Sequence, residues 1–463
     1  MAYEQDDVVI LGAGPAGYVA GIRAAQLGLR ACIVEKDRPG GVCLNVGCIP
    51  SKALIHQADI LRSASDLEAM GVSIDRSGLS YAKVVEKSRQ VTATMTRGVE
   101  YLLKKNKVRV VKGRGTIVDR NTIALEDGTK VRGKNLLIAT GSRPKEIPGF
   151  AFDGHAVLSS DDAVTLTSLP ARVLVLGGGA IGCEFAHIFS SFGSRVTLVE
   201  MEEHLLPLED AENVAILERA FRRRGITVLT GTRATELDRT AGKLAVTLRG
   251  KGGETSRVEV EKVLLVVGRI PNTSGIGLEN VGLELSRGFI PVGDYYETEV
   301  AGLYAAGDVV NSPLLAHVAS KEAEVAVEHM AHHPTMKRLD PNAVPGAIYA
   351  EPQIASFGLT EKRAREEGIP HEKATFPFRA VGRAVATDAS EGQVKVLVDP
   401  RTREILGAHI VGDAAPELLH ELLLARTAEL LPEDIARMIH VHPTLSEAVM
   451  ESMRMVEGWA VHL

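Results

Sequence analysis

The chain has 463 residues, of which 45% are hydrophobic and 24% are charged, and its formal net charge is −6. This composition is typical of a folded globular protein. It excludes a disordered chain, and without an uninterrupted run of about 20 apolar residues it gives no membrane span. The negative charge gives no reason to expect nucleic-acid binding. The length predicts roughly two to four domains.

The first residues, MAYEQDD, lack the basic patch and apolar run of a secretory signal. We therefore expect a cytoplasmic protein, in a reducing compartment where structural disulfides are rare.

The first predicted unit spans residues 8–36, VVILGAGPAGYVAGIRAAQLGLRACIVEK. An apolar strand leads into Gly12, Gly14 and Gly17 at GxGxxG spacing, and a helix and a second strand ending at Glu35 follow. Such glycines permit a tight turn and let backbone N–H groups approach a pyrophosphate at a helix N-terminus. Glu35 is placed to accept hydrogen bonds from a ribose. The whole pattern predicts a dinucleotide-binding βαβ unit.

Cys43 and Cys48 lie five positions apart in GGVCLNVGCIP, residues 40–50. Three kinds of chemistry fit such a pair: a structural crosslink, half of a metal site, or a disulfide that opens and closes during a reaction. A zinc site needs four ligands, and Cys32 and Cys183 are not spaced to complete one. We expect these two to be small core residues and no metal to be bound. A reducing compartment disfavours a purely structural crosslink.

The segment between these cysteines is predicted to bend. In a straight helix the two would be about 7.5 Å apart along the axis, whereas the Cα atoms of a disulfide lie roughly 4.4–6.8 Å apart. Asn45 and Gly47 are residue types that tolerate a bend. A helix over residues 51–70 would place Cys48 at its positive end, one turn before Lys52, and both effects stabilise a thiolate.

The dinucleotide pattern returns at residues 173–200, with Gly177, Gly179, Gly182 and Glu200 in the corresponding positions. Two intact units predict two dinucleotides, most simply a flavin and a nicotinamide. A carboxylate at Glu200 would repel a 2′-phosphate, and residues 201–210, MEEHLLPLED, hold no arginine or lysine to bind one. The sequence therefore favours NAD over NADP.

From about residue 342 the pattern changes to strands over 346–360, 392–400 and 404–412, followed by helices. The helix over 417–430 has a leucine-rich face, which fits equally a subunit interface or packing on its own sheet. The segment from 342 to the end holds 12 lysines and arginines against 18 aspartates and glutamates, so it carries the whole net charge.

His442, in HVHPTLSE at residues 440–447, is the candidate base. Opening and closing a disulfide needs a group that exchanges protons near neutral pH. Glu447 could orient the imidazole and stabilise its charged form. His440 lies two residues away, and the pattern does not say whether it takes part.

Together these segments resemble the pyridine nucleotide–disulfide oxidoreductase family over essentially the whole chain. The resemblance rests on GGVCLNVGCIPSK (40–52), ATGSRPKEIPG (139–149), GGGAIGCEFA (177–186), VGRIPNT (267–273), LYAAGDV (303–309) and HPTLSE (442–447). It implies an α/β fold with two Rossmann-like dinucleotide-binding domains, one for FAD and one for NAD, and a C-terminal α+β interface domain. The implied boundaries are 1–150 for the first part of the FAD domain, 151–272 for the NAD domain, 273–341 for the central FAD part and 342–463 for the dimerisation domain.

The resemblance also implies site residues. FAD would be bound by Gly12, Gly14, Gly17, Glu35, Lys52, Thr140, Gly141, Asp308 and Ala316. NAD would be bound by Gly177, Gly179, Gly182, Glu200 and Gly268. The catalytic set would be Cys43 as the thiol that exchanges with substrate, Cys48 against the flavin, Lys52 with Glu184 as an ion pair, and His442 as a base oriented by Glu447.

The implied reaction is oxidation of a dihydrolipoamide group on an acyltransferase or carrier protein, with reduction of NAD⁺. The implied enzyme is a homodimer that docks the subunit-binding domain of an acyltransferase core. Ala180 stands where glutathione-reducing members carry a tyrosine, and Val42 stands where a threonine is usual. The alternatives are an NAD(P)H-dependent reductase of another disulfide and a redox-silent assembly subunit, against which the intact cysteine pair and HPTLSE argue.

Overall fold

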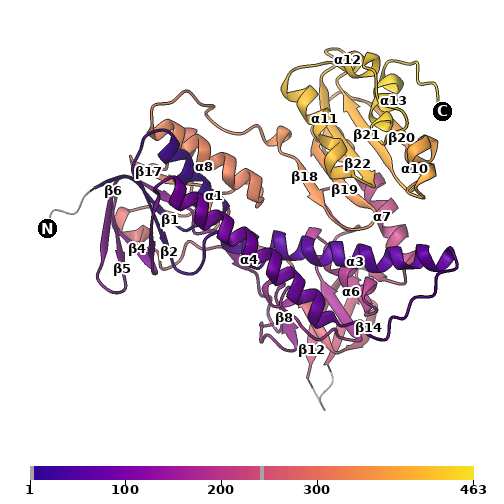
Figure 1. Ribbon diagram of the computed structural model, residues 1–463, viewed down its shortest axis with the longest axis horizontal. Helices are drawn as coiled ribbons and strands as arrows, with labels where there is room; N and C mark the ends of the chain where they lie inside the picture. The colour runs from indigo at the N-terminus through magenta and orange to yellow at the C-terminus, as the bar shows by residue number, and fades with distance from the viewer. Residues whose placement is uncertain (1–4, 240–243, 463) are drawn as a thin grey trace.

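The computed structural model describes residues 5–239 and 244–462 (Figure 1). Two α/β parts are built from the first three quarters of the chain, and an antiparallel sheet covered by helices is built from the last quarter. This architecture confirms the predicted fold class.

The first sheet has the strand order β3-β2-β1-β6-β5-β4, and β17 also pairs with β6. Its parallel core is made of β1 (Asp6–Leu11), β2 (Ala31–Glu35), β3 (Arg109–Lys112), β6 (Lys130–Ile138) and β17 (Leu303–Ala305). The antiparallel strands β4 (Gly115–Asp119) and β5 (Thr122–Leu125) form one edge. Two helices, α1 (Pro15–Gln26) and α8 (Ala316–Met330), pack together on one face. The strands read as continuous apolar runs because both faces of a parallel sheet are covered.

The second sheet has the parallel order β11-β10-β9-β15-β8. Its strands are β8 (Val157–Leu158), β9 (Arg172–Leu176), β10 (Arg195–Val199), β11 (Thr227–Leu229) and β15 (Lys262–Leu265). The helices are α5 (Ser160–Ala163), α6 (Ala180–Ser191) and α7 (Ala211–Arg223), and a three-stranded sheet adds β12 (Thr232–Asp238), β13 (Leu244–Gly250) and β14 (Thr255–Val260). A two-stranded pair, β7 (Ser142–Pro144) and β16 (Arg269–Pro271), links the two α/β parts.

The C-terminal sheet is antiparallel with the order β18-β19-β22-β21-β20. Its strands are β18 (Gly346–Ile348), β19 (Gln353–Gly358), β20 (Glu372–Pro377), β21 (Gln393–Val398) and β22 (Ile405–Gly412). The helices are α9 (Glu361–Glu366), α10 (Gly382–Ala386), α11 (Ala415–Thr427), α12 (Pro432–Arg437) and α13 (Glu447–Val456). The strand predicted over 346–360 is thus two strands, because a turn at Glu351 and Pro352 separates them.

The leucine-rich helix α11 packs mainly on its own sheet. Leu418, Leu419 and Leu422 are buried in the cluster formed with β19, β21 and β22. Leu424 points away and is exposed. Packing on its own sheet therefore accounts for most of the apolar face that the sequence pattern left open.

Two long helices cross the middle of the molecule, α3 (Cys48–Ala69) and α4 (Tyr81–Lys105), and the short helix α2 (Gly41–Asn45) precedes α3. Short 3₁₀ turns lie at Leu278–Val281, Asp294–Tyr296, Pro341–Ala343 and Phe378–Ala380. In the part of the chain that the structure describes, no helix has both the length and the apolar character needed to cross a membrane.

Candidate active site

The first glycine turn joins β1 to α1. Gly12 has φ +107°, and a Cβ there would lie 2.3 Å from the carbonyl oxygen of Ala139. A Cβ at Gly17 would lie 1.9 Å from the carbonyl oxygen of Gly12, so neither position accepts a side chain. The described atom nearest to a Cβ built at Gly14 is Gly41 Cα, 4.0 Å away. No described side chain caps α1. The turn therefore presents free N–H groups and open space to an anion.

The second glycine turn repeats this geometry between β9 and α6. Gly177 has φ +110°, and its Cβ would lie 2.5 Å from the carbonyl oxygen of Val266. A Cβ at Gly182 would lie 1.8 Å from the carbonyl oxygen of Gly177. No described atom lies within 4 Å of a Cβ built at Gly179, and within the described residues α6 has no side-chain cap. Both turns fit the pyrophosphate of a dinucleotide.

Each predicted ribose carboxylate is tied to its own glycine turn. Glu35 Oε2 accepts a hydrogen bond of 2.6 Å from the backbone N–H of Ala13, and Glu200 Oε2 accepts one of 2.6 Å from Gly178. Each carboxylate oxygen has a second lone pair. Capacity therefore remains for a ribose hydroxyl, and that contact stays our prediction.

Thr140 and Asp308 lie at the carboxyl ends of β6 and β17, the edge of the sheet that also carries the first glycine turn. Thr140 Oγ1 donates to the carbonyl oxygen of Asn272 at 2.7 Å, and Asn272 Nδ2 donates to the carbonyl oxygen of Thr140 at 3.0 Å. Ser142 Oγ donates to Asp308 Oδ2 at 2.5 Å, and Arg269 Nε lies 3.9 Å from the same oxygen. The sequence analysis did not identify Asn272, Ser142 or Arg269 as site residues. The motifs ATGSRP and VGRIPN contain all three, but no spacing rule pairs them.

Two further predicted cofactor positions face open space, and a third begins a helix. Gly141 has φ +70° and Gly268 has φ +122°, and no described atom lies within 4 Å of a Cβ built at either. Ala316 is the first residue of α8, whose N-terminus has no capping side chain among the described residues. The two glycine positions can accept a ligand without any side chain moving.

The cysteines lie on two helices, Cys43 within α2 and Cys48 as the first residue of α3. The predicted bend exists, but Asn45 does not form it. Asn45 is the last residue of α2, and its side-chain amide donates to the carbonyl oxygen of Gly41 at 2.9 Å. That local hydrogen bond keeps Asn45 helical, so the break falls at Val46 and Gly47, between the two helices.

The two thiols have different acidities. The hydrogen bond with the Cys43 thiol lowers the pKa of Cys48 to about 7, against the effect of burial, and the positive charge of Lys52 lowers it further. The same hydrogen bond, together with burial, raises the pKa of Cys43 well above its ordinary range. Cys48 is therefore the sulfur that holds the negative charge near neutral pH.

Lys52 and Glu184 form the predicted ion pair between α3 and α6. Lys52 Nζ lies 2.8 Å from both carboxylate oxygens. Tyr349, just after β18, completes the arrangement: its backbone N–H donates to Glu184 Oε1 at 3.1 Å, and its ring centroid lies 4.8 Å from Lys52 Nζ. The sequence analysis missed Tyr349, because it lies 165 positions from Glu184 and outside every motif.

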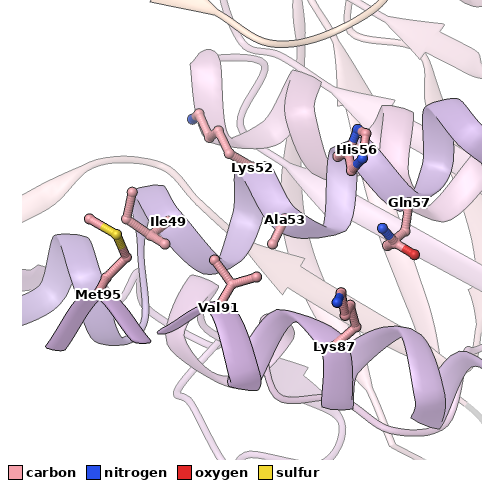
Figure 2. A pocket seen from close by; sticks show the side chains of 8 residues that line it. All are labelled: Ile49, Lys52, Ala53, His56, Gln57, Lys87, Val91 and Met95. Atoms are coloured by element: carbon pink, nitrogen blue, oxygen red, sulfur yellow. The ribbon is translucent and has the colours of Figure 1, made fainter. Parts of the chain in front are cut away.

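A pocket of about 310 Å³ lies between α3 and α4, next to this ion pair. Its lining combines apolar and basic side chains: Ile49, Lys52, Ala53, His56, Gln57, Lys87, Val91 and Met95. In Figure 2, Ile49 and Ala53 on α3 lie opposite Met95 and Val91 on α4. The pocket can hold a hydrocarbon chain against α3, the helix that begins at Cys48.

His442 and Glu447 form a hydrogen-bonded pair in the C-terminal part, with His442 Nδ1 2.9 Å from Glu447 Oε1. Partial burial raises the pKa of Glu447, but hydrogen bonds from His442 and the Thr444 N–H outweigh it and hold the pKa below its usual range. The His442 side chain is 76% exposed. Within residues 5–239 and 244–462, no recorded hydrogen bond joins it to either cysteine.

The remaining cysteines are core residues, as predicted. Cys32 and Cys183 are fully buried, and burial raises the pKa of both thiols, that of Cys32 to about 12. His440 differs from His442 in that its ring is buried and its Nε2 lies 2.8 Å from Glu421. The surroundings of Cys32, Cys183 and His440, buried and in the case of His440 ion-paired, are typical of structural residues.

Two family models match this chain. The model described as "Pyridine nucleotide-disulphide oxidoreductase" covers residues 6–323, and the model of the dimerisation domain of the same family covers residues 344–453.

Two curated relatives that match over nearly their full length share one name. The chain is 40% identical to the dihydrolipoyl dehydrogenase of Bacillus subtilis, covering 98% of this chain and 99% of that protein. It is 41% identical to the dihydrolipoyl dehydrogenase of Geobacillus stearothermophilus, covering 99% and 98%. Among solved structures, LpdA from Mycobacterium tuberculosis matches with a TM-score of 0.90 and 28% identity over 97% of this chain and 99% of that one.

Proposed function

Because the chain belongs to the pyridine nucleotide-disulphide oxidoreductase family, we propose that it acts as a dihydrolipoyl dehydrogenase, oxidising protein-bound dihydrolipoamide with NAD⁺. The observation that carries this proposal is the setting of the cysteine pair. Cys48, with a pKa near neutrality, starts a helix whose Lys52 is bound to Glu184 of the NAD-binding half. Relatives named dihydrolipoyl dehydrogenase align with nearly the whole of this chain and over nearly their own full length.

The cofactors are FAD and NAD, as in the family. When bound, FAD accepts the electron pair that the dithiol loses and supplies a hydride to NAD⁺. We assign FAD to the turn at Gly12 and the edge formed by Thr140 and Asp308, and NAD to the turn at Gly177 with Glu200. The positive φ values, the uncapped helix ends and the open space at Gly14 and Gly179 support this assignment.

The cysteines exchange disulfide bonds with the substrate in two steps. A substrate thiolate attacks Cys43 Sγ, the bond between Cys43 and Cys48 breaks, and Cys48 leaves as a thiolate. The second substrate thiolate then attacks the substrate sulfur bound to Cys43, which forms the cyclic disulfide product and releases Cys43. A low pKa makes Cys48 a good leaving group, which supports this order.

We assign the dithiol-bearing arm to the pocket between α3 and α4. A lipoyl arm is a flexible hydrocarbon chain that ends in two sulfurs. The apolar lining of the pocket, on α3 and α4, is formed by Ile49, Ala53, Val91 and Met95. Burial of these apolar surfaces favours the arm by about 25 cal/mol per Å².

His442 takes up the protons that the dithiol releases, and Glu447 holds its ring in position. The match to a dimerisation-domain model over residues 344–453 supports a homodimer. We propose that His442 acts on the cysteine pair of the partner subunit, because it is exposed and makes no hydrogen bond to the described cysteines of its own chain. The neighbouring Ile439 and Val441 are 95% and 74% exposed, which suits a segment covered by a second copy.

The protein partner carries the lipoyl group. We propose that a small basic domain of an acyltransferase core docks on the C-terminal part, whose 18 acidic residues outnumber its 12 basic ones. We also propose a cytoplasmic location, because Cys32 and Cys183 remain isolated buried thiols, as is usual in a reducing compartment. The domain boundaries at 150, 272 and 341 remain our assignment.

A steady-state assay tests the proposal. With dihydrolipoamide and NAD⁺ the enzyme should turn over, and NADH should reduce lipoamide in the reverse direction. Oxidised glutathione and coenzyme A disulfide serve as competing substrates. A higher kcat/KM for either would favour the second candidate, a reductase of another disulfide, and no turnover at all would favour a redox-silent subunit.

A further inference from the structure

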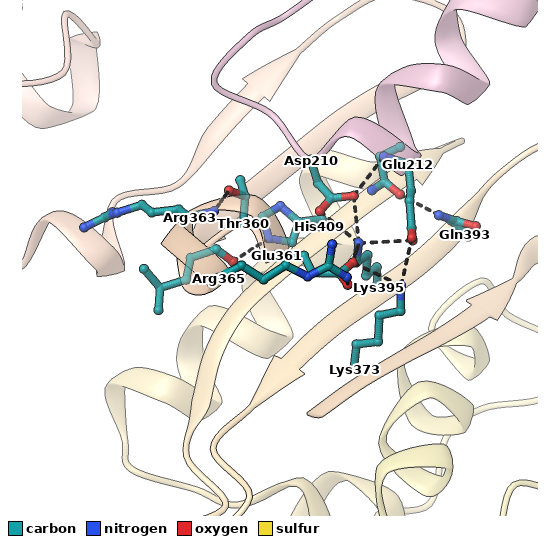
Figure 3. A network of polar contacts seen from close by, with 12 residues as sticks. Asp210, Glu212, Thr360, Glu361, Arg363, Arg365, Lys373, Gln393, Lys395 and His409 are labelled. Atoms are coloured by element: carbon teal, nitrogen blue, oxygen red, sulfur yellow. Dashed lines mark hydrogen bonds and ion pairs between the residues drawn. The ribbon is translucent and has the colours of Figure 1, made fainter. Parts of the chain in front are cut away.

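A buried cluster of charges joins the NAD-binding half to the C-terminal sheet (Figure 3). Lys395 on β21 has a side chain that is only 1% exposed. Its Nζ lies 2.9 Å from Asp210 Oδ2, 3.0 Å from Glu212 Oε2 and 2.7 Å from Glu361 Oε2. Lys373 on β20 bridges Glu212 and Glu361 at 2.8 and 3.0 Å but has no recorded contact with Asp210. Lys395 is thus the cation that holds Asp210.

The neighbours of Asp210 also reach into the C-terminal sheet. Glu209 is packed against β18, because a Cβ built at Gly346 would lie 3.7 Å from Glu209 Oε1. Asn213 Oδ1 accepts a hydrogen bond of 2.8 Å from Gln393 Nε2 on β21. The start of α7 is therefore fastened to a domain that begins 131 residues later in the chain, at residue 342.

Asp210, which Lys395 holds, is the last residue of the loop that follows the proposed NAD site. That loop, residues 201–210, starts directly after Glu200. The Leu206 N–H donates to the carbonyl oxygen of Gly178, in the glycine turn, at 2.9 Å. A Cβ at Gly178 would lie 2.6 Å from Leu205 Cδ2, so the loop packs tightly on the turn. Asp210 then caps α7 by accepting the Glu212 N–H at 3.1 Å.

We propose that Lys395 is a positioning residue for NAD: through Asp210 it holds the loop 201–210 against the glycine turn that receives the dinucleotide. This rests on the proposed function, which places NAD on that turn. Without the ammonium group, the buried Asp210 loses its counterion beside Glu212 and Glu361, which keep Lys373. Like charges that lose their counterion in a buried place repel each other and move toward water. The start of α7 and the loop would move with them.

The test compares Lys395→Met with Lys373→Met in the FAD-loaded dimer. Lys373 contacts two of the same carboxylates, is 41% exposed and serves as the matched control. A displacement of about 1 Å can lower a reaction rate by up to ~100-fold. We expect the Kd for NAD⁺, measured by titration calorimetry, and the KM for NAD⁺ both to rise at least about tenfold in Lys395→Met. Both constants should stay near wild type in Lys373→Met. The rate at which dihydrolipoamide reduces the flavin without NAD⁺ should be unchanged in both variants.

A second variant protects the test if Lys395→Met does not fold. Asp210→Asn keeps a residue suited to an N-cap but removes the charge, and it should weaken NAD⁺ binding in the same way. In a variant carrying both changes, NAD⁺ should bind more tightly than in Lys395→Met alone, because one stranded charge is gone. A lower melting temperature with an unchanged Kd for NAD⁺ in the folded variants would overturn the proposal and leave Lys395 a purely structural residue. If wild-type protein binds NAD⁺ but does not oxidise dihydrolipoamide, the proposed substrate fails and this inference stands.

Discussion

Replacing Glu447 with glutamine tests how much the carboxylate beside His442 contributes to turnover. The hydrogen bond between His442 Nδ1 and Glu447 Oε1 is 2.9 Å long. A hydrogen bond to a charged group contributes about 1.5–3 kcal/mol. The glutamine keeps a carbonyl oxygen that can accept the same hydrogen bond without the charge, so the lower end applies. About 1.5 kcal/mol corresponds to roughly a tenfold fall in kcat for Glu447→Gln.

His442→Gln removes the proton acceptor itself, so kcat should fall by about 10²–10⁴-fold. His440→Gln is the matched control, because His440 also pairs with a glutamate, at 2.8 Å, but is buried. Its kcat should stay close to wild type in protein that mass spectrometry shows to be dimeric.

The assay follows NADH formation from dihydrolipoamide, and reduction of ferricyanide by NADH serves as a reference because that reaction bypasses the thiols. The three variants should keep the reference activity. A wild-type kcat in Glu447→Gln would contradict the orienting role. An equal loss in Glu447→Gln and His442→Gln would contradict the division of work between the two residues.

Further predictions concern the thiols, the cofactors and the partner. The Cys43→Ser variant should show the long-wavelength absorbance of a thiolate beside oxidised flavin without any reductant, and Cys48→Ser should never show it; equal bands would reverse the roles. In two-electron-reduced wild type that band should fade as the pH falls through about 7, because the pKa of Cys48 lies there and its thiolate is lost below it. The enzyme should prefer NAD⁺ over NADP⁺ in kcat/KM, and Glu200→Arg should narrow the gap by helping NADP⁺; a wild-type preference for NADP⁺ would refute our assignment. Docking of the basic acyltransferase domain should weaken as salt rises, mainly through a slower on-rate in surface plasmon resonance, whereas salt-independent binding would indicate an apolar contact.

Local motifs allowed much of the fold and site to be predicted. Both glycine turns have the expected form because Gly12 and Gly177 are positions where backbone geometry leaves no room for a side chain. The helix after Cys48 was expected from its apolar spacing and from Pro50. The ion pair between Lys52 and Glu184 was expected from the family resemblance rather than from any spacing rule, since 132 residues separate the two.

Contacts between distant segments could not be predicted. Tyr349 reaches Glu184 only because β18 lies beside α6, and Asn272 reaches Thr140 only because β16 pairs with β7. No periodicity in one segment reports its neighbour in space. Lys395 is the clearest example of such a contact. The sequence shows only a polar residue within a predicted strand, whereas in the fold its side chain is buried against three carboxylates.

The bend at the cysteines shows a different limit. Asparagine tolerates turns, but the Asn45 side chain instead bonds to the carbonyl oxygen of Gly41 and keeps α2 helical. The leucines of α11 show a third limit, because an apolar face indicates burial without identifying the covering surface.

The central claim is that one site is built from the cysteine pair of one subunit and His442 of the other. Cys48→Ser and His442→Gln should each be nearly inactive as homodimers. Refolding an equal mixture with FAD makes about half of the dimers mixed, and two-fold symmetry gives each mixed dimer one intact site. Dihydrolipoamide oxidation should then recover to about a quarter of the wild-type rate. If dimers shown by mass spectrometry to be mixed stay as inactive as the parents, each histidine serves its own chain and the shared site is wrong.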